Sequence, residues 1–342
     1  MASHVRPKRI LVLVHEDLIP PESLDGLTDA EIQEIRTEDD VIIGLGELGH
    51  QVRVLGLYEE LAPLRETLET FKPHIVFNLL EEFRGQPLLD YHMVAYLVLR
   101  KVAYTGCNPR GLLIARDKAL SKKILHYHRI RVPRFATFPR GQRVRRPKRL
   151  TFPAIVKSQT EEASYGIAQA SVVTSDEALV ERVQFIHERI GTAAIAEQFV
   201  RGRELYVAVM GNQRLQTMPP WELDLSRMPG EAHRIATRKV KFDLDYQEKH
   251  KIEIKRAANL SEEQLAHIDK TSKRIYRRLG LDGYARIDYR LAPDGKLYFL
   301  EANPNPDIAD GEEFSSAAAA SGLEYPKLLQ RLVSLGLRRG AG

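Results

Sequence analysis

The feature that most constrains the fold is a hairpin pattern near the C-terminal end of the chain. Residues 283–306, GYARIDYRLAPDGKLYFLEANPNP, place two alternating segments on either side of Asp294-Gly295, which is the strongest short-range signal for a β-hairpin. If these two residues form the loop, Asp288 lies directly opposite Glu301 on one face of the hairpin. The other face would carry four mostly apolar side chains suited to a core: Ile287, Tyr289, Leu300 and Ala302.

Two carboxylates in direct opposition across a hairpin repel each other unless positive charge lies between them. Arg286 and Asn303 fall on the same face, and Arg286 supplies part of that charge. A divalent cation would supply more, and the side-chain oxygens of Asp, Glu and Asn suit Mg²⁺. The pattern therefore predicts either a magnesium site or a network of Arg, Glu and Asp on the surface of an exposed hairpin.

The chain is long enough for two or three domains and has the composition of a globular protein. Its 342 residues are 43% hydrophobic and 28% charged, which argues against extensive disorder. The single cysteine, Cys107, excludes an intrachain disulfide and a thiolate metal cluster. A net charge of +5 is compatible with anionic small molecules and does not require nucleic acid. The apolar runs are too short for a signal peptide or a membrane span, so we expect a cytoplasmic protein.

Strands and helices alternate in the N-terminal third of the chain. A helix is expected from Glu38 to Leu48, and residues 18–37 predict a loop or lid with a short helix. Continuous apolar strands alternating with helices favour a parallel, doubly wound α/β sheet. The expected strands are three apolar segments: 9–14, 51–57 and 74–80.

The rest of the chain predicts further elements with recognisable ends. A basic helix is expected over 114–128, and Ser175 and Ser261 should cap two more helices, the latter at capping-box spacing with Gln264. Residues 211–258 show no clear pattern. A helical tail closes the chain. Further strands are expected at three segments: 152–158, 193–200 and 204–210.

The hairpin resembles the magnesium-binding segment of the ATP-grasp enzymes, and the chain is most similar to their D-alanine–D-alanine ligase branch. The resemblance implies that Asp288, Glu301 and Asn303 bind two Mg²⁺ ions, with Mn²⁺ as an alternative, and that Arg286 stabilises the oxyanion at the reacting carbonyl. It also implies three lobes, with ATP held between the central and C-terminal ones. The expected lobes are an N-terminal α/β domain (1–108), a central lobe (109–195) and a C-terminal lobe (196–342).

Further segments resemble the family in the same order along the chain. They include YTGCNPRGLLIARDK at 104–118, FPAIVKS at 152–158, EASYGI at 162–167 and AEQFVRGREL at 196–205. The resemblance implies these contacts to ATP: Lys118 and Lys157 to the phosphates, Ser164 and Gly166 in a loop that closes over them, Glu197 with the backbone of Gln198, Phe199 and Val200 at the adenine, Glu204 at the ribose, and Lys239 or Lys241 completing the phosphate cage.

The implied activity is the ATP-dependent joining of a carboxylate, expected to be an amino acid, to an amine through an acyl phosphate, with release of ADP and phosphate. Arg286, Lys157 and Ser164 are the implied catalytic residues. Three alternatives stay open: a D-alanine–D-alanine ligase proper, a phosphotransferase on the same fold, and a nucleotide-binding protein without catalysis. The implied partners are small molecules, with no nucleic acid and no membrane. Related ligases are commonly dimers, so a homodimer is expected.

The chain departs from the family where the substrates should bind. PNPDIADGEEF at 304–314 stands where the ligases carry a Gly and a Ser, and Glu81 stands where they carry a His-Gly pair. These extra acids predict a substrate with a cationic group, with Glu16, Glu81, Asp307 and Glu312 as candidate contacts; the alternative is a solvated acidic rim. Residues 139–149 are basic and lack aromatic residues, which favours a solvated connecting loop over a site for nucleic acid or a phosphorylated partner.

Overall fold

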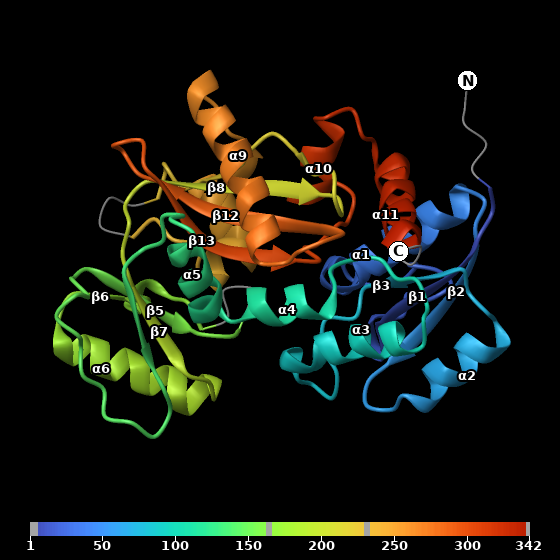
Figure 1. The fold of residues 1–342 in the computed structure, drawn as a ribbon, viewed down its shortest axis with the longest axis horizontal. Coiled ribbons are helices and arrows are strands. Elements are labelled where there is room, and N and C mark those ends of the chain that lie inside the picture. The colour runs from blue at the N-terminus through green and yellow to red at the C-terminus, as the bar shows by residue number, and fades with distance from the viewer. Residues whose placement is uncertain (1–5, 162–165, 229–232, 340–342) are drawn as a thin grey trace.

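The computed structural model describes residues 6–161, 166–228 and 233–339. Its strands form three sheets, and Figure 1 shows them in separate parts of the molecule. An N-terminal three-stranded parallel sheet lies at the right of the view, and two antiparallel sheets lie at the left, one below the other. This arrangement confirms the expected three-lobed α/β fold with a parallel N-terminal sheet.

The N-terminal sheet has the order β2-β1-β3, with β1 (Arg9–His15), β2 (Gln51–Leu57) and β3 (Ile75–Asn78) all parallel. The five residues Ile10 to Val14 have no exposed surface, as expected for a strand covered on both faces. Helices α2 (Ala62–Thr70) and α3 (Asp90–Leu99) belong to this lobe. The chain adds β2 on one side of β1 and β3 on the other, so the strand order reverses between β1 and β3, the type of point at which open α/β sheets bind ligands.

Helix α1 (Asp29–Glu47) is longer than the sequence analysis expected. The expected loop over 18–37 and helix start at Glu38 were wrong, because Thr28 and Glu31 form a capping box. The Glu31 N–H donates to Thr28 Oγ1 at 3.3 Å, and the Thr28 N–H donates to Glu31 Oε2 at 2.8 Å. Two backbone N–H groups that have no partner within the helix are thereby hydrogen-bonded. This allows the helix to begin at Asp29, nine residues before the expected start.

A single basic helix was expected over 114–128, but the structure has two helices there, α4 (Pro109–Arg116) and α5 (Lys118–Tyr127). Asp117 separates them with an extended backbone, and its carboxylate accepts the N–H groups of Ala119 and Leu120, both at 2.9 Å. An Asp in this conformation caps the helix that follows it. Lys118 is therefore the first residue of a new helix rather than the middle of a long one.

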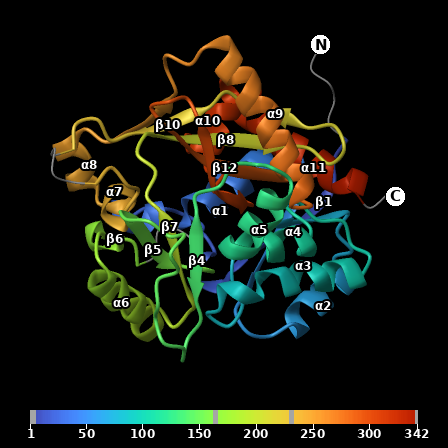
Figure 2. The ribbon, with the colours of Figure 1, turned by 60° about the vertical axis from the view of Figure 1, so that its left-hand side comes forward.

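The central sheet has the order β4-β7-β5-β6 and packs against α6 (Asp176–Phe185). Ser175 caps α6 as expected, and the helix continues as a π-turn, Ile186–Ile190, that ends at Gly191. Figure 2 shows α6 below these strands. The strands are β4 (Phe135–Phe138), β5 (Ala154–Ser158), β6 (Val172–Val173) and β7 (Ala194–Gln198).

The C-terminal sheet has the order β11-β10-β8-β12-β13, and β9 pairs with β8. The unpatterned region 211–258 supplies three of its strands and two short helices, α7 (Arg238–Phe242) and α8 (Leu244–His250). Ser261 caps α9 (Glu262–Arg278) with the expected capping box. The strands are β8 (Arg203–Met210), β9 (Gln216–Thr217), β10 (Trp221–Asp224), β11 (Glu253–Arg256), β12 (Tyr284–Leu291) and β13 (Leu297–Pro304).

The helical tail returns to the N-terminal sheet. Helix α10 (Glu313–Ala319) leads to α11 (Tyr325–Arg339), which packs against α1 and β3. Leu329 approaches Gly44 of α1 so closely that a Cβ at this glycine would lie 2.6 Å from Leu329 Cδ1. Within the described ranges, no helix has the length and apolarity needed to cross a membrane. Three short 3-10 turns complete the fold: Glu16–Leu18, Pro87–Leu89 and Gln169–Ser171.

Candidate functional site

The hairpin of β12 and β13 places the predicted carboxylates opposite each other. Asp288 pairs with Glu301 and Arg286 pairs with Asn303, which confirms the predicted register at these positions. The register differs nearer the loop, where Tyr289 pairs with Phe299 instead of Leu300. The prediction is therefore right at the site and wrong beyond it.

Two irregularities that cancel explain this register. The loop is one residue longer than predicted, because Ala292 bonds to Lys296 across Pro293-Asp294-Gly295 and Gly295 has a φ of +78°, the geometry of a three-residue hairpin loop. A β-bulge between Asp288 and Tyr289 then restores the original pairing.

The bulge changes which side chain faces the core. Leu300 is the extra residue on β13, and it lines a pocket beside Glu301. Phe299 takes the core position that was predicted for Leu300, and it has no exposed surface. The bulge thus turns two consecutive side chains, Leu300 and Glu301, toward the same pocket.

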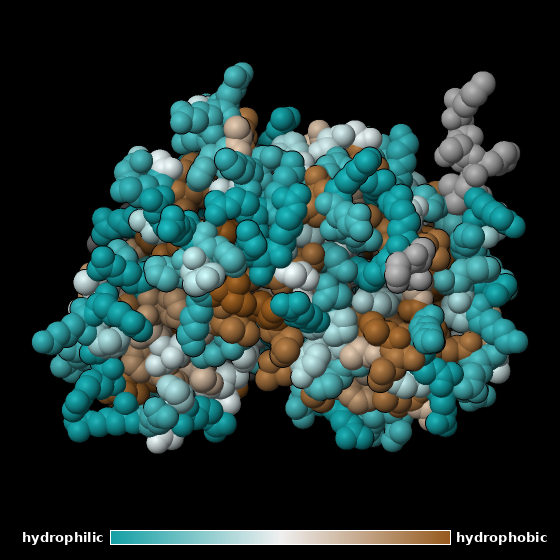
Figure 3. Space-filling model, in the orientation of Figure 1, coloured by the Kyte–Doolittle hydropathy of each residue, from teal (hydrophilic) through white to brown (hydrophobic). Residues whose placement is uncertain are grey.

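This pocket lies between the central and C-terminal sheets and collects most of the residues that the resemblance implied. Strands β5 and β7 supply one wall, and β8, β12 and β13 supply the other. The face of the molecule shown in Figure 3 is largely hydrophilic, with apolar side chains gathered near its centre. Nine predicted residues line the pocket: Lys157, Glu197, Gln198, Phe199, Val200, Glu204, Lys241, Asp288 and Glu301.

Lys118 lies beside the hairpin although it comes from α5. Its Nζ is 3.7 Å from Glu301 Oε2 and donates to the Glu161 carbonyl, and the residue is buried. Burial alone would raise the pKa of Glu301, but Lys118 and Lys157 outweigh it and hold this pKa well below its usual value. Glu301 is therefore a carboxylate surrounded by positive charge.

Glu197 lies between two lysines at the base of the pocket. Its Oε1 is 3.1 Å from Lys122 Nζ and 3.2 Å from Lys157 Nζ. Burial opposes the charge of Glu197, yet the two ammonium groups prevail and lower its pKa. Burial also disfavours the Lys157 ammonium, but Glu197 and Glu301 outweigh it and raise the pKa of Lys157. The side chain predicted to meet adenine is thus part of a buried charge network.

Lys122 is the main residue of this network that the sequence analysis missed. It is fully buried, and burial is the first cause that lowers its pKa to about 8. A signal was present, because Lys118, Lys122 and Leu125 share one face of α5 at helical spacing, and all three are buried. A lysine on the apolar face of a helix needs a partner, and that requirement could have singled it out.

Arg286 and Asp288 form a bidentate pair, with Nε to Oδ1 at 2.8 Å and Nη2 to Oδ2 at 3.1 Å. Asn303 donates to the same carboxylate at 2.9 Å. Arg286 Nη1 also lies 3.3 Å from Glu313 Oε1. Burial is the main cause that raises the pKa of Asp288, and Glu301 adds to it. In the described parts of the chain, no group of three His, Cys, Asp or Glu residues is placed to hold a metal, so a metal here needs Asn303 as well.

Glu204 lies in the pocket with a partner that sequence analysis did not identify. Its Oε2 accepts from Arg290 Nη2 at 2.7 Å, and its Oε1 accepts from the Tyr206 hydroxyl at 3.1 Å. Arg290 also donates to the carbonyls of Gly202 and Arg234. Arg290 faces Glu204 across neighbouring strands β12 and β8, so alternation along these two strands was its only sequence signal.

The structure separates the two candidates for the last phosphate lysine. Lys241 lines the pocket. Lys239 has a side chain that is 61% exposed, and it pairs with Asp243 at 3.8 Å. Ser164 lies outside the described residues. Gly166 is described, and its φ of +73° is left-handed, a conformation that glycine adopts without strain.

The four candidate substrate acids lie in different surroundings. Glu16 and Glu81 are exposed at the carboxyl ends of β1 and β3. Asp307 is also exposed, and its Oδ1 accepts from Thr37 Oγ1 of α1 at 2.8 Å. Glu312 Oε1 lies 3.6 Å from Arg36 Nη1, also on α1.

The sequence analysis missed Glu38, a buried acid on α1 whose pKa is affected by Asp307. Glu38 is 5% exposed, and burial, together with Asp307, raises its pKa to about 7. Burial, with Asp307 and Glu313 adding to it, also raises the pKa of Glu312 to about 7. Glu38 follows Ile35 and precedes Val41 on the apolar face of α1, and that position was its sequence signal. We call Glu38, Asp307 and Glu312 the acidic junction.

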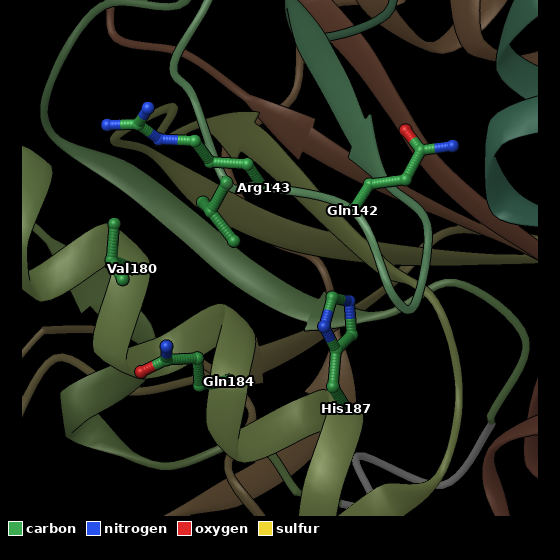
Figure 4. A pocket seen from close by; sticks show the side chains of 6 residues that line it. Gln142, Arg143, Val180, Gln184 and His187 are labelled. Carbon is green, nitrogen blue, oxygen red and sulfur yellow. The ribbon is translucent and has the colours of Figure 1, made fainter.

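The basic segment 139–149 contains no helix or strand, and it forms a surface connection as expected. Arg146 pairs with Asp176 at 2.6 Å, and Arg140 donates to the Gly191 carbonyl at 2.9 Å. A hollow of about 460 Å³ lies between this segment and α6 with the π-turn that follows it. Figure 4 shows His187 and Arg143 among its lining side chains. These residues are separate from those that line the pocket between the sheets.

Comparison with known proteins identifies the family. The family model described as the C-terminus of D-ala D-ala ligase matches residues 124–334. A D-alanine–D-alanine ligase of Nitratidesulfovibrio vulgaris strain Hildenborough is 31% identical over 302 residues, which cover 85% of this chain and 88% of that protein. The fold matches D-alanine–D-alanine ligase of Bacillus anthracis complexed with ATP, with a TM-score of 0.74, 20% identity, and coverage of 98% of this chain and 99% of that one.

A second solved structure shares the fold. It is the VanG D-Ala:D-Ser ligase of Enterococcus faecalis, with a TM-score of 0.70, 20% identity, and coverage of 97% of this chain and 100% of that one. The family model and the relative of N. vulgaris each cover most of the chain. The chain therefore belongs to the D-alanine–D-alanine ligase family, whose members are ATP-dependent carbon–nitrogen ligases with the ATP-grasp fold.

Proposed function

We propose that this enzyme joins an amino-acid carboxylate to an amine by way of an acyl phosphate, with ATP bound in the pocket between the central and C-terminal sheets. The observation that carries the proposal is the pairing of Asp288 with Glu301 at a pocket that Lys157 and Lys241 also line. Carboxylates for a cation and ammonium groups for phosphate oxygens are the parts that phosphoryl transfer requires. The known ligase of Bacillus anthracis was crystallised with ATP.

The hairpin residues fit a magnesium ion by the chemistry of their donors. Asp288, Glu301 and Asn303 offer only hard oxygen ligands, and the first two face each other across adjacent strands. We assign all three as the residues that would hold two Mg²⁺ ions, or Mn²⁺ in their place. When bound, the metal would neutralise charge on the phosphates during transfer.

The other side chains would bind the nucleotide and substrates. Lys118, Lys157 and Lys241 supply positive charge for the phosphates, and Glu204 accepts hydrogen bonds from the ribose. Glu197 and the backbone of 198–200 would meet the adenine, while Ser164 and Gly166 are proposed to contact the phosphates. The substrate carboxylate attacks the γ-phosphate, and the amine then attacks the acyl phosphate. Arg286 would stabilise the negative charge on the carbonyl oxygen during this second step.

Trapping with hydroxylamine tests the proposed reaction. Hydroxylamine converts an acyl phosphate into a hydroxamate, so wild-type enzyme with Mg·ATP and the correct acid should produce one. Asp288→Asn and Glu301→Gln should each lower the rate by roughly a hundredfold or more, because each removes charge at the reacting phosphate. Asp294→Asn is the matched control: Asp294 lies at the tip of the same hairpin with an exposed side chain paired to Lys296.

The same experiment distinguishes the alternatives. A phosphotransferase would release a stable phosphorylated product, and a nucleotide-binding protein without catalysis would consume no ATP. Neither would form a hydroxamate. A panel of amino acids that includes D-alanine decides whether the enzyme is a D-alanine–D-alanine ligase proper.

We further propose that one substrate carries a cationic group. Glu38 and Glu312 support this proposal, because burial and neighbouring acids raise both pKa values to about 7. Such a shift means that burial first, and the neighbouring acids after it, disfavour the charged carboxylates, although Arg36 lies beside Glu312. Glu81 and Asp307 both act on the pKa of Tyr284, so the acids beyond β3 and β13 lie around one tyrosine. Glu16, like Glu81, is an exposed candidate at the carboxyl end of its strand.

A comparison of acceptors of matched size tests the cationic substrate. The account expects a cationic amine to be used at least roughly tenfold better than its neutral analogue, and Asp307→Asn together with Glu312→Gln should reduce that preference. Glu22→Gln, an exposed change on the N-terminal lobe, should leave it intact. Equal use of cationic and neutral amines by the wild-type enzyme would refute the proposal.

A further inference from the structure

Lys122 places a charge at the base of the nucleotide pocket, where it is shielded from solvent. Its Nζ lies 3.1 Å from Glu197 Oε1 and donates to the carbonyl of Leu300. It also lies 5.4 Å from the centre of the Phe299 ring. An ammonium group without access to water costs free energy unless it is paired and hydrogen-bonded. A methionine would fill similar space without that cost, so the charge itself needs an explanation.

Lys122 links three elements that form the pocket. It belongs to α5, Glu197 belongs to β7, and Leu300 is the bulge residue of β13. β13 ends the order of its sheet, and Leu300, as the bulge residue, has no paired residue on β12; its carbonyl accepts from Lys122. The bond from Lys122 satisfies this carbonyl and holds the bulge that sets Asp288 opposite Glu301.

Lys122 also decides how much positive charge faces the pocket. Glu197 Oε1 is nearly equidistant from Lys122 and Lys157, at 3.1 and 3.2 Å. Lys122 has no exposed surface, whereas Lys157 lines the pocket. One carboxylate can neutralise one ammonium group. With Lys122 behind Glu197, the charge of Lys157 remains available to an anion in the pocket.

We propose that Lys122 is a positioning residue for phosphate binding: it neutralises Glu197 from the buried side, so that Lys157 remains available to the nucleotide phosphates, and it holds the Leu300 bulge in place. The inference rests on the proposed function, because it requires nucleotide phosphates in this pocket. It predicts that loss of Lys122 weakens the binding of phosphates and leaves the binding of the nucleoside almost unchanged.

The first test compares ATP with adenosine, which lacks phosphates, in the full-length protein. Lys122→Met retains the length of the side chain and removes its charge. We expect the affinity for ATP to fall roughly ten- to a hundredfold and the affinity for adenosine to change by less than about twofold. Lys123→Met is the matched control, because Lys123 is the next residue of α5 and is exposed. It should alter neither affinity.

The second test removes both charges of the pair. The variant Lys122→Met with Glu197→Gln has the same net charge at the pocket as the wild type, so the ratio of ATP affinity to adenosine affinity should recover to within about threefold of wild type. This variant carries the test by itself if Lys122→Met does not fold.

Two results would overturn the inference. One is an equal loss of ATP and adenosine binding in Lys122→Met, which would indicate a general structural defect. The other is a double variant whose affinity ratio stays as low as that of the single variant. A wild-type protein that binds adenosine and ATP equally would instead refute the proposed function.

Discussion

The nucleotide pocket and the acidic junction both gather carboxylates, but they balance them differently. In the pocket, Lys122 and Lys157 flank Glu197 and lower its pKa, and Lys118 does the same for Glu301. At the acidic junction, burial and neighbouring acids raise the pKa of both Glu38 and Glu312 to about 7. The two regions contain similar residues and differ in their supply of positive charge.

This difference indicates what each region is suited to bind. The pocket pairs its acids internally and leaves lysine charge for an anion, which is the preorganisation that phosphoryl transfer requires. At the acidic junction, burial and neighbouring acids disfavour the charged carboxylates near neutral pH, and a proton or a bound cation would relieve that cost. The departure from the family sequence at 304–314 falls in the second region, through Asp307 and Glu312.

The largest effect should come from removing a pocket lysine. Lys157→Met eliminates one of the cations that line the pocket and leaves Glu197 paired with Lys122. We expect kcat/KM for ATP to fall roughly a thousandfold, with little change in the melting temperature. Steady-state kinetics and thermal unfolding measure the two quantities. A fall in activity that merely follows a loss of folded protein would contradict the assigned role.

A smaller effect should separate Lys241 from Lys239. Lys241 lines the pocket, whereas Lys239 is exposed beside Asp243. Lys241→Ala should raise the KM for ATP by roughly ten- to a hundredfold, and Lys239→Ala by less than about twofold. Both residues belong to α7, so the second variant controls for damage to that helix. Equal increases in the KM for ATP would contradict the assignment of Lys241, and not Lys239, to the phosphate site.

Removing a charge at the acidic junction should stabilise the protein instead of impairing it. Because the folded-state pKa of Glu38 is raised from 4.5 to about 7, the folded protein binds the proton more tightly than the unfolded chain. Its contribution is favourable below pH 4.5 and is lost as pH rises through 7. Glu38→Gln should therefore stabilise the protein at pH 8 by about 1–3 kcal/mol and have little effect at pH 4.5.

Chemical denaturation at both pH values measures this difference. Glu34→Gln is the matched control, since Glu34 is exposed on the same helix, and it should change the free energy of unfolding by less than about 0.5 kcal/mol at either pH. If Glu38→Gln destabilises the protein equally at both pH values, Glu38 makes contacts that the charge comparison omits.

The smallest expected effect concerns the helix that carries the acidic junction. Thr28→Ala removes the capping side chain of α1, and we expect the free energy of unfolding to fall by about 1 kcal/mol. Because Thr28 is not among the residues that line the nucleotide pocket, the KM for ATP should stay unchanged. A changed KM would show that the two regions are coupled through α1.

Sequence predicted best where a short pattern fixes both backbone and chemistry. Alternation around Asp294-Gly295 predicted the hairpin and the pairing of Asp288 with Glu301. The longer loop and the bulge at Leu300 were not predictable, because they cancel and leave no trace in the spacing of the site residues. Prediction succeeded there although its register near the loop was wrong.

Sequence predicted least where a side chain depends on distant partners. The helical spacing of Lys122 marks it as a lysine that needs a partner, but its partners on β7 and β13 lie far along the chain and become known only when α5 packs against those strands. Arg290 is recognised as a partner of Glu204 only after β12 aligns with β8. The start of α1 was predictable in principle, because Thr28 and Glu31 have capping-box spacing. Glu38 also carried a signal, as an acid on an apolar helix face.

The binding of ATP with and without Mg²⁺, measured by calorimetry, tests the central claim most directly. If Asp288 and Glu301 hold the metal for a nucleotide in this pocket, Mg²⁺ should strengthen ATP binding at least roughly tenfold over binding in a chelator, and Asp288→Asn with Glu301→Gln should abolish that gain. Equal ATP affinity with Mg²⁺ and with chelator in the wild-type protein would contradict the account.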